Sequence, residues 1–280
     1  MYKVIKKEKL TPSAVLLEIE DSRAKLVKPG QYALVQFRED SEPIPLSFLE
    51  VKESSYTFLV EAVGRATLEI VELLEDGFSF IEAPCGSPFP VEEYGKVLLI
   101  SKNWGIAPLI NVGKALRERG NEVYFIHVGE NEEKVFLTEK AADISEEFLL
   151  FTEDGSLGEE GNTDWALRYF LDNFVKPDLV VSAGSNIDSQ MVCEVAKEKE
   201  LNHIAMVNAH ILDANGLCLA CRVLIEGEEK LACLDGPWFD GKKVNWDYAI
   251  QKEFFYRDEE KKALEAFMKE LRRIKAKRGN

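Results

Sequence analysis

Three of the five cysteines of this chain lie within sixteen residues, at Cys218, Cys221 and Cys233. Thiols at this density, in a sequence with no recognisable secretory leader, indicate metal or redox chemistry rather than disulfide bonds. A [2Fe–2S] cluster needs two protein ligands on each iron, usually four thiolates. A fourth cysteine is missing here, but Asp213, five residues before Cys218, stands where it would be expected.

A zinc site is the alternative for the same segment. His210 together with the three cysteines would supply one imidazole and three thiolates, which is a common tetrahedral zinc set. Gly216 would allow the loop to turn its amides toward either kind of metal centre. The other two cysteines, Cys85 and Cys193, stand alone in apolar stretches, and we expect them to be buried core residues.

Composition excludes several classes of function. The chain has 280 residues, 46% of them hydrophobic, and carries 50 acidic against 35 basic residues, for a formal charge of −15. That charge argues against nucleic acid, because phosphates need a basic face. No apolar run approaches the roughly 18 residues of a membrane span, so we expect no membrane segment. The N-terminus lacks an apolar leader, and we expect a cytoplasmic protein.

The texture of the sequence predicts a β barrel followed by an α/β domain. Short β-rich runs such as 56–61, separated by turn residues, are typical of a small barrel or sandwich. Nearly continuous apolar runs such as 97–100 and 179–182 then alternate with helical patterns such as 108–119, which predicts a doubly wound α/β domain. We therefore divide the chain into a barrel (1–94), an α/β domain (95–208), a cluster segment (209–247) and a charged helical tail (248–280).

The tail predicts one long helix. From Glu259 to Lys277 the apolar residues form a single stripe, with acidic residues first and basic residues last, which suits the helix dipole. We expect this stripe to pack on the rest of the chain, with docking onto a partner protein as the alternative.

The cysteine segment resembles a known family. Its pattern, Asp-x4-Cys-x2-Cys-Arg followed by Ala-Cys-x-Asp-Gly-Pro-x-Phe-Asp-Gly, is similar to the C-terminal end of the small (alpha) subunit of NADH-dependent ferredoxin:NADP+ oxidoreductases. That family is also described as the beta subunit of sulfide dehydrogenase. It is related to the electron-transfer subunit of dihydroorotate dehydrogenase and, more distantly, to ferredoxin reductases. The similarity runs from Tyr2 to about Asp247 and leaves out the tail.

The resemblance implies a ferredoxin-reductase-like flavin barrel, a nucleotide-binding-type domain and a small C-terminal [2Fe–2S] segment. It implies FAD as a second cofactor. It also implies that the cluster ligands are Asp213, Cys218, Cys221 and Cys233.

Two flavin motifs of the family are recognisable. Where relatives have Arg-Ile-Pro-Leu-Thr, this chain has Pro43-Ile-Pro-Leu-Ser47, which keeps the hydroxyl but loses the arginine. The second motif opens a helix, whose free N–H groups and partial positive charge suit a pyrophosphate; on local sequence alone it reads as a turn and N-cap. The resemblance implies that FAD contacts Pro45, Leu46, Ser47, Gly64, Arg65, Ala66 and Thr67, with Arg65 as a replacement cation.

The nicotinamide site departs most from the family. Relatives have Gly-Gly-Gly-x-Gly-Ile-Ala-Pro after the first strand of the domain, whereas residues 101–108 read Ser-Lys-Asn-Trp-Gly-Ile-Ala-Pro. Trp104 would crowd a dinucleotide, and Glu130, where relatives have a cation nearby, would repel its phosphates. We expect NAD(H) to bind poorly or not at all; the alternative is a pocket rebuilt around Lys102. The retained positions, implied as nucleotide contacts, are Gly105 and Asp154.

The function implied is that of a small electron-transfer subunit. In the family the larger partner holds a second flavin, [4Fe–4S] clusters and an NADP(H) site and reacts with ferredoxin, and electron bifurcation occurs. Two alternatives remain: an electron-transfer subunit of dihydroorotate dehydrogenase, which generally has cysteine where Asp213 stands, and a zinc-stabilised binding module. No Ser/His/Asp or Cys/His catalytic set is present; we expect His127 in the core and His203 at the surface.

Overall fold

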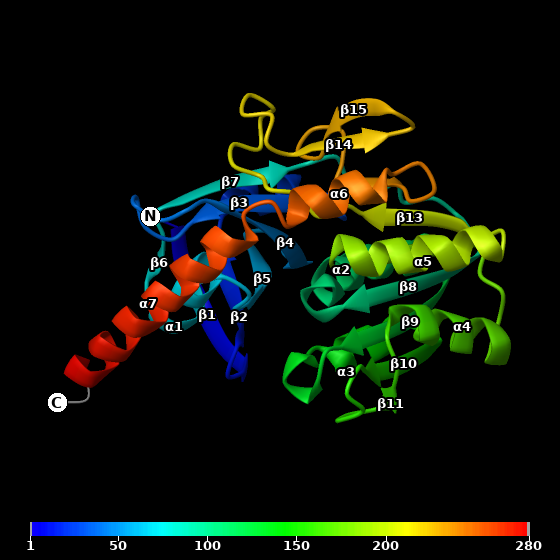
Figure 1. The fold of residues 1–280 in the computed structure, drawn as a ribbon, viewed down its shortest axis with the longest axis horizontal. Helices are drawn as coiled ribbons and strands as arrows, with labels where there is room; N and C mark the ends of the chain where they lie inside the picture. The colour runs from blue at the N-terminus through cyan, green and yellow to red at the C-terminus, as the bar shows by residue number, and fades with distance from the viewer. Residues whose placement is uncertain (1, 279–280) are drawn as a thin grey trace.

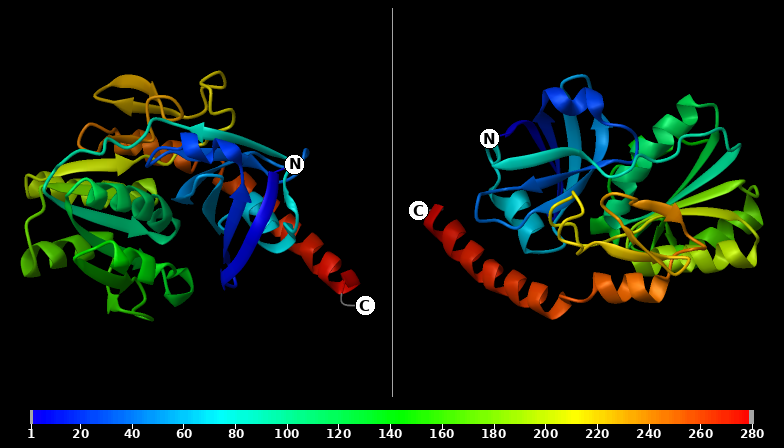
Figure 2. Two further views of the ribbon diagram at one scale, coloured as in Figure 1. Left: turned by 180° about the vertical axis from the view of Figure 1, so that it is seen from behind. Right: turned by 90° about the horizontal axis from the view of Figure 1, so that it is seen from above.

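The computed structural model describes residues 2–278 and consists of a β barrel beside an α/β domain, with a long C-terminal helix running along the outside of the barrel (Figures 1 and 2). Within those residues the barrel sheet has seven strands, all paired antiparallel, in the order β6-β1-β2-β5-β4-β3-β7. Its strands are β1 (Tyr2–Thr11), β2 (Ala14–Glu20), β3 (Tyr32–Gln36), β4 (Ile44–Val51), β5 (Ser55–Glu61), β6 (Gly77–Phe78) and β7 (Phe80–Cys85), with the short helix η1 (Ser22–Leu26) and α1 (Arg65–Leu73) between them.

Every second side chain along the strands points into the barrel and fills its core. On β2, Val15, Leu17 and Ile19 are buried, as a strand with one face inward requires, and they pack with Phe58 of the neighbouring β5 and Ile70 of α1. The predicted barrel is confirmed. The sequence did not indicate β1, half of which is Lys and Glu and which is largely exposed, or β4, which contains a proline.

The α/β domain is doubly wound, as predicted. Its sheet has the order β11-β10-β9-β8-β12-β13-β16, parallel except for β16. One face packs on α2 and the other on α4 and α5. The strands are β8 (Lys96–Lys102), β9 (Glu122–Gly129), β10 (Glu147–Thr152), β11 (Glu159–Glu160), β12 (Leu179–Ala183), β13 (Asn202–Met206) and β16 (Trp238–Asp240). The helices are η2 (Asn103–Gly105), α2 (Ile106–Glu118), η3 (Glu132–Lys134), α3 (Thr138–Asp143), α4 (Thr163–Asn173) and α5 (Asn186–Glu198).

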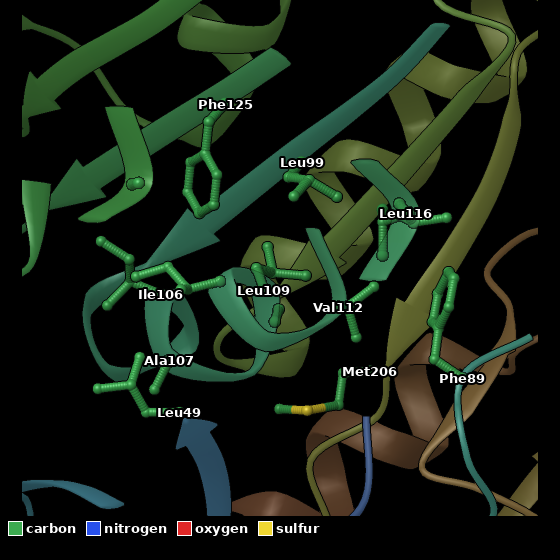
Figure 3. Packing of buried hydrophobic residues seen from close by; sticks show 14 of the residues in the cluster. Leu49, Phe89, Leu99, Ile106, Ala107, Leu109, Val112, Leu116, Phe125 and Met206 are labelled. Carbon is green, nitrogen blue, oxygen red and sulfur yellow. The ribbon is translucent and has the colours of Figure 1, made fainter. Parts of the chain in front are cut away.

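An apolar interface joins the two domains. Leu49 of β4 lies beside Ala107 at the start of α2, and the same cluster continues to Leu99 of β8 and Met206 of β13 (Figure 3). A buried core of this kind holds the domains in one arrangement, so a site between them is preformed.

The segment after β13 is tied to both domains. Residues 222–231 form a hairpin of β14 (Arg222–Ile225) and β15 (Glu228–Leu231), and the chain then returns to add β16 to the edge of the α/β sheet. Trp238 on β16 donates from Nε1 to the carbonyl oxygen of Gly30 at 2.7 Å, which anchors the segment to the barrel. The sequence did not predict this edge strand.

The tail forms α6 (Trp246–Glu253) and α7 (Arg257–Arg278). Phe267 and Leu271 of α7 are buried, α7 contacts α1, and Lys275 lies 2.6 Å from Glu72 of that helix. The prediction that the stripe packs on its own chain is confirmed. Among residues 2–278, no helix combines the length and apolar character needed to cross a membrane.

Two histidines are buried in the α/β sheet. His127 was expected in the core, and it is fully buried with Nδ1 at 2.8 Å from the hydroxyl of Ser101. The expectation that His203 lies at the surface is wrong, because β13 is covered on both faces and His203 is 2% exposed, with Nε2 2.9 Å from Ser182 Oγ. Burial lowers the pKa of each imidazole to about 3.

Candidate functional site

A cavity of about 270 Å³ lies between the barrel and the α/β domain. Its wall is largely apolar, and its polar groups include Ser47 from β4, Glu61 from the end of β5 and Thr67 from α1. Trp104 of η2 closes the side formed by the α/β domain. An apolar cavity with a few converging polar groups is typical of a cofactor site.

The first turn of α1 faces a second cavity that adjoins the first. Thr67 Oγ1 accepts hydrogen bonds from the backbone N–H groups of Val63 and Gly64, each at 3.0 Å, and so fixes the start of the helix. A Cβ built on Gly64 would meet nothing within 4 Å, so the space above the helix start is open. Arg257 and Lys261 of α7 line the same cavity, together with the carboxylates Glu253 and Glu260.

The flavin residues implied by the resemblance divide into two groups. Pro45, Leu46, Ser47 and Thr67 line the first cavity, and Gly64 lines the second. Arg65 and Ala66 line neither of these cavities. The Arg65 guanidinium lies 3.3 Å from Glu69 and over the ring of Phe267, so it is engaged within α1 and with α7.

The α/β sheet reverses its strand order between β8 and β12, which is where doubly wound sheets bind dinucleotides. Here the backbone is closely packed at two glycines. A Cβ on Gly105 would lie 2.1 Å from the carbonyl oxygen of Ala183, and one on Gly184 would lie 2.9 Å from Cβ of Lys102. The Lys102 ammonium is buried and lies 2.5 Å from a carboxylate oxygen of Glu153, an ion pair that lacks hydrogen-bond geometry.

Acidic groups occupy the rest of this edge. Glu253 of the tail accepts a hydrogen bond from the backbone N–H of Asn186 at 2.9 Å, in the first turn of α5. A carboxylate thus sits where a phosphate would otherwise be attracted. Burial raises the pKa of Glu253, although hydrogen bonds from Asn186 and Asn208 oppose the rise. Asp154 is exposed and accepts hydrogen bonds from Ser156, which hold its pKa below the usual value.

The cysteine loop brings the four predicted ligands into one region. Asp213 Oδ2 accepts from the backbone N–H of Cys218 at 2.6 Å. Cys221 and Cys233 are 1% exposed and hydrogen-bond to one another, whereas Cys218 is exposed. The N–H of Asn215 also donates to Asp213, to Oδ1 at 3.1 Å.

The backbone of this loop is unusual. Ala214, Gly216 and Leu219 all have positive φ, at 56°, 79° and 55°. Non-glycine residues adopt this conformation at a cost, and such strain concentrates at binding sites. Here it turns the loop amides inward toward the ligands, as hydrogen bonding to cluster sulfur requires.

The protonation states of the free ligands follow from their surroundings. Burial and the neighbouring Cys221 raise the pKa of Cys233 to about 12, so a metal must displace its proton. Burial alone would raise the pKa of Asp213, but hydrogen bonds from Asn215, Cys218 and Gly216 outweigh it, and the pKa is lowered. The carboxylate is therefore ionised and able to act as an oxygen donor.

One buried polar atom bears on whether these residues fit an iron–sulfur cluster. The hydroxyl of Tyr32, on a residue 3% exposed, has no hydrogen-bond partner within the described part of the chain, and Cys221, Cys233 and Asp213 lie near it. Buried polar groups are rarely left unpaired. An acceptor such as the sulfur of a cluster would satisfy it, so the residues present fit an iron–sulfur centre.

The arrangement does not match the zinc alternative. His210 packs its ring against Tyr256, at 5.8 Å between centroids, and lines the cavity near α7 rather than the hollow beside the cysteines. Across residues 2–278, no group of three or more His, Cys, Asp and Glu side chains is arranged to hold a single metal ion. A diiron cluster divides its ligands between two irons and does not need all four at one point.

One neighbour of the cluster loop was missed by the sequence analysis. Cys85, at the end of β7, is buried as expected, but it also lines the hollow formed by Asp213 and Cys233. Burial raises the pKa of its thiol to about 11. No local pattern signals this proximity, because Cys85 lies more than 120 residues before Asp213 in the chain.

Comparison with known proteins identifies the family of this chain. Residues 208–245 match the iron–sulfur cluster binding domain of dihydroorotate dehydrogenase B. A Thermotoga maritima protein named as a homolog of the dihydroorotate dehydrogenase B (NAD(+)) electron transfer subunit is 32% identical, over 96% of each chain. The electron transfer subunit of Clostridium acetobutylicum dihydroorotate dehydrogenase B is 31% identical, over 85% of this chain and 98% of the relative.

The solved structures agree. A chain from work on flavin-based electron bifurcation by the NADH-dependent reduced ferredoxin–NADP oxidoreductase superposes with a TM-score of 0.88 at 29% identity, over 96% of this chain and 98% of that one. The ferredoxin reductase of carbazole 1,9a-dioxygenase, at 17% identity and a TM-score of 0.59, shares the fold. Our expectation that the tail lies outside the resemblance is wrong. Both alignments cover 96% of this chain, which is more than residues 2–247 contain, so they extend into the tail. The chain belongs to the family of dihydroorotate dehydrogenase B electron transfer subunits and their homologues.

Proposed function

We propose that this chain is the small electron-transfer subunit of a heterodimeric ferredoxin:NAD(P)+ oxidoreductase, and that it binds FAD and a [2Fe–2S] cluster. FAD supplies the exchange between two-electron and one-electron transfer, and the cluster supplies one-electron transfer. The observation that carries the proposal is that the cavity with the flavin motifs and the cysteine loop meet at one buried side chain, Tyr32, which belongs to both surroundings.

In this proposal the first cavity holds the flavin ring. Pro45 and Leu46 form its apolar wall, and the hydroxyl of Ser47 is a hydrogen-bond partner for a polar edge of the ring. Gly64, Arg65, Ala66 and Thr67 build the helix start that receives the pyrophosphate. Since Arg65 is paired with Glu69, the cation beside the pyrophosphate is better supplied by Arg257 and Lys261, which line that cavity.

The cluster ligands are Asp213, Cys218, Cys221 and Cys233. An aspartate is a harder donor than a thiolate, and Cys85 is the obvious competitor for its place. Removing the carboxylate by Asp213→Ala will alter the electron paramagnetic resonance (EPR) spectrum of the reduced cluster or abolish it. Cys85→Ser serves as the matched control and will leave the spectrum unchanged; the reverse result would assign the fourth ligand to Cys85.

Cofactor analysis tests the whole proposal. The complex, isolated without oxygen, will contain one FAD, two irons and two acid-labile sulfides per small subunit beyond the flavin, iron and sulfide of the partner's own cofactors. A colourless preparation with zinc and no sulfide would overturn it.

We further propose that the chain binds NAD(H) poorly. Trp104 and the Lys102–Glu153 pair lie at the edge where a dinucleotide would bind, and Glu253 accepts a hydrogen bond at the start of α5. Gly105 packs its backbone closely against β12, and Asp154 retains the position of a contact. NADH at micromolar concentration will bleach the flavin slowly or not at all, whereas rapid bleaching would refute this part of the proposal.

The partner is a larger subunit with its own flavin, [4Fe–4S] clusters and NADP(H) site, through which ferredoxin reacts, in an arrangement that can support electron bifurcation. The second candidate is an electron-transfer subunit of dihydroorotate dehydrogenase, which the names of several relatives favour. Copurification from the source cell decides between them, because the large subunit is a different protein in each case.

A further inference from the structure

Tyr32 lies between the two proposed cofactor sites. On β3 it pairs with Ser47 of β4 on one side and with Cys85 of β7 on the other. Its side chain lines the cavity that holds the flavin motifs. It also belongs to the buried cluster that contains Cys221 and Cys233.

The tip of the ring points to the cluster side. A Cβ built on Gly86 would lie 2.6 Å from Cε1 of Tyr32, so the ring edge passes directly over this glycine. The chain at Gly86 is joined to the cluster segment, because the N–H of Ser87 donates to the carbonyl oxygen of Gly236 at 2.7 Å. The edge of the ring therefore lies beside the stretch of chain that is hydrogen-bonded to the cluster segment.

That hydroxyl is one of seven buried side-chain nitrogen and oxygen atoms in residues 2–278 that lack a hydrogen-bond partner. It is buried, and none of the groups in residues 2–278 accepts a hydrogen bond from it. Tyr56, the other deeply buried tyrosine of the barrel, donates to Asp21 at 2.8 Å. A phenol buried without a partner destabilises a protein relative to phenylalanine, so an acceptor outside the polypeptide is the simplest explanation for it.

We propose that Tyr32 is a positioning residue that donates a hydrogen bond from its hydroxyl to a sulfur of the cluster while its ring forms part of the wall of the flavin cavity. This inference rests on the proposed function, since it needs both cofactors. A hydrogen bond to sulfur becomes stronger when the cluster gains an electron, so it favours the reduced cluster and raises its potential. Tyr32 would then adjust the driving force for electron transfer between the two sites.

The test is an EPR-monitored redox titration of the intact complex. Tyr32→Phe keeps the ring and removes the donor, and the equilibrium constant for reduction of the cluster will fall about tenfold, which is about 59 mV for one electron. Tyr56→Phe removes a buried hydroxyl elsewhere in the barrel and will leave the potential unchanged. Equal potentials in wild type and Tyr32→Phe, at full iron content, would overturn the inference.

A second variant covers loss of the cluster in Tyr32→Phe. Site-specific 3-fluorotyrosine at position 32 keeps the shape of the side chain and makes its hydroxyl a stronger donor, so the potential will rise. An unchanged or lower potential would refute the hydrogen bond. A wild-type complex without iron and sulfide would instead overturn the proposed function, and this inference with it.

Discussion

Replacing Lys134 by methionine will leave a buried carboxylate at the domain interface without its ion-pair partner. Lys134 of η3 lies 2.6 Å from Glu61 of β5, and the two side chains are 19% and 1% exposed. This ion pair joins the α/β domain to the barrel beside the first cavity. Burial raises the pKa of Glu61 even though Lys134 opposes the rise, and nearby Glu130 adds to it.

The cost of the change has an upper bound. Without its partner, Glu61 can escape an unpaired buried charge by taking up a proton. From its ordinary pKa of 4.5, protonation at pH 7 costs at most about 3.4 kcal/mol, at about 1.36 kcal/mol per pH unit. Because the pKa is raised already in the wild type, part of this cost is present there too. We therefore expect Lys134→Met to lower the free energy of unfolding by about 2–3 kcal/mol at pH 7.

The pH dependence has a definite sign. When the pKa of a carboxyl is higher in the folded state than in the unfolded state, the free energy of unfolding falls as pH increases above the unfolded-state pKa. Acidification therefore reduces the stability loss of the variant. At pH 5.5 the bound falls to about 1.4 kcal/mol. Adding Glu61→Gln to Lys134→Met will restore most of the loss at pH 7, because a neutral amide needs no counter-charge.

Urea unfolding followed by tryptophan fluorescence measures these differences. Lys140→Met is the matched control: Lys140 also lies 2.6 Å from a glutamate of the barrel, Glu50, but the side chains are 41% and 37% exposed. We expect it to cost less than about 1 kcal/mol. Equal losses in the two variants, or a loss in Lys134→Met that does not change with pH, would refute the reasoning.

Three further predictions follow from burial and backbone geometry. His203→Gln will reduce the loss of folding free energy on acidification. In the wild type, His203 has a pKa lowered to about 3, so between pH 7 and pH 5 the unfolded chain binds a proton that the folded chain does not, which costs about 2 kcal/mol. Equal slopes of urea stability against pH in wild type and variant would contradict this. Gly216→Ala forces a side chain onto φ 79° and to 2.6 Å from Leu234, and will reduce iron bound per chain. Phe267 is 4% exposed, and Phe267→Ala will weaken the docking of α7 by about 2 kcal/mol or more and raise proteolysis of the tail about 30-fold. Met268 is 43% exposed, and Met268→Ala, the control, will have neither effect.

Sequence patterns predicted the elements that local chemistry determines. The apolar strands β8 and β12 were found because both faces of a central parallel strand are buried. The helix α7 was found because its stripe repeats every three or four residues. The strand β4 was missed because its proline and its half-exposed residues hide the alternation. The three-residue strand β16 was missed because the strand with which it pairs is β13, more than thirty residues earlier.

The sequence alone determined the spacing of Asp213 and the three cysteines, the two flavin motifs and the loss of glycines before α2. These depend on residues close together in the chain, whose backbone angles and side-chain donors act locally. Only the tertiary structure decided that Lys102 lies against Glu153, that Cys85 borders the cysteine loop and that Tyr32 lies between the first cavity and that loop. Such contacts join residues from distant strands, and they are chosen by the packing of two domains around a shared core, which no local pattern records.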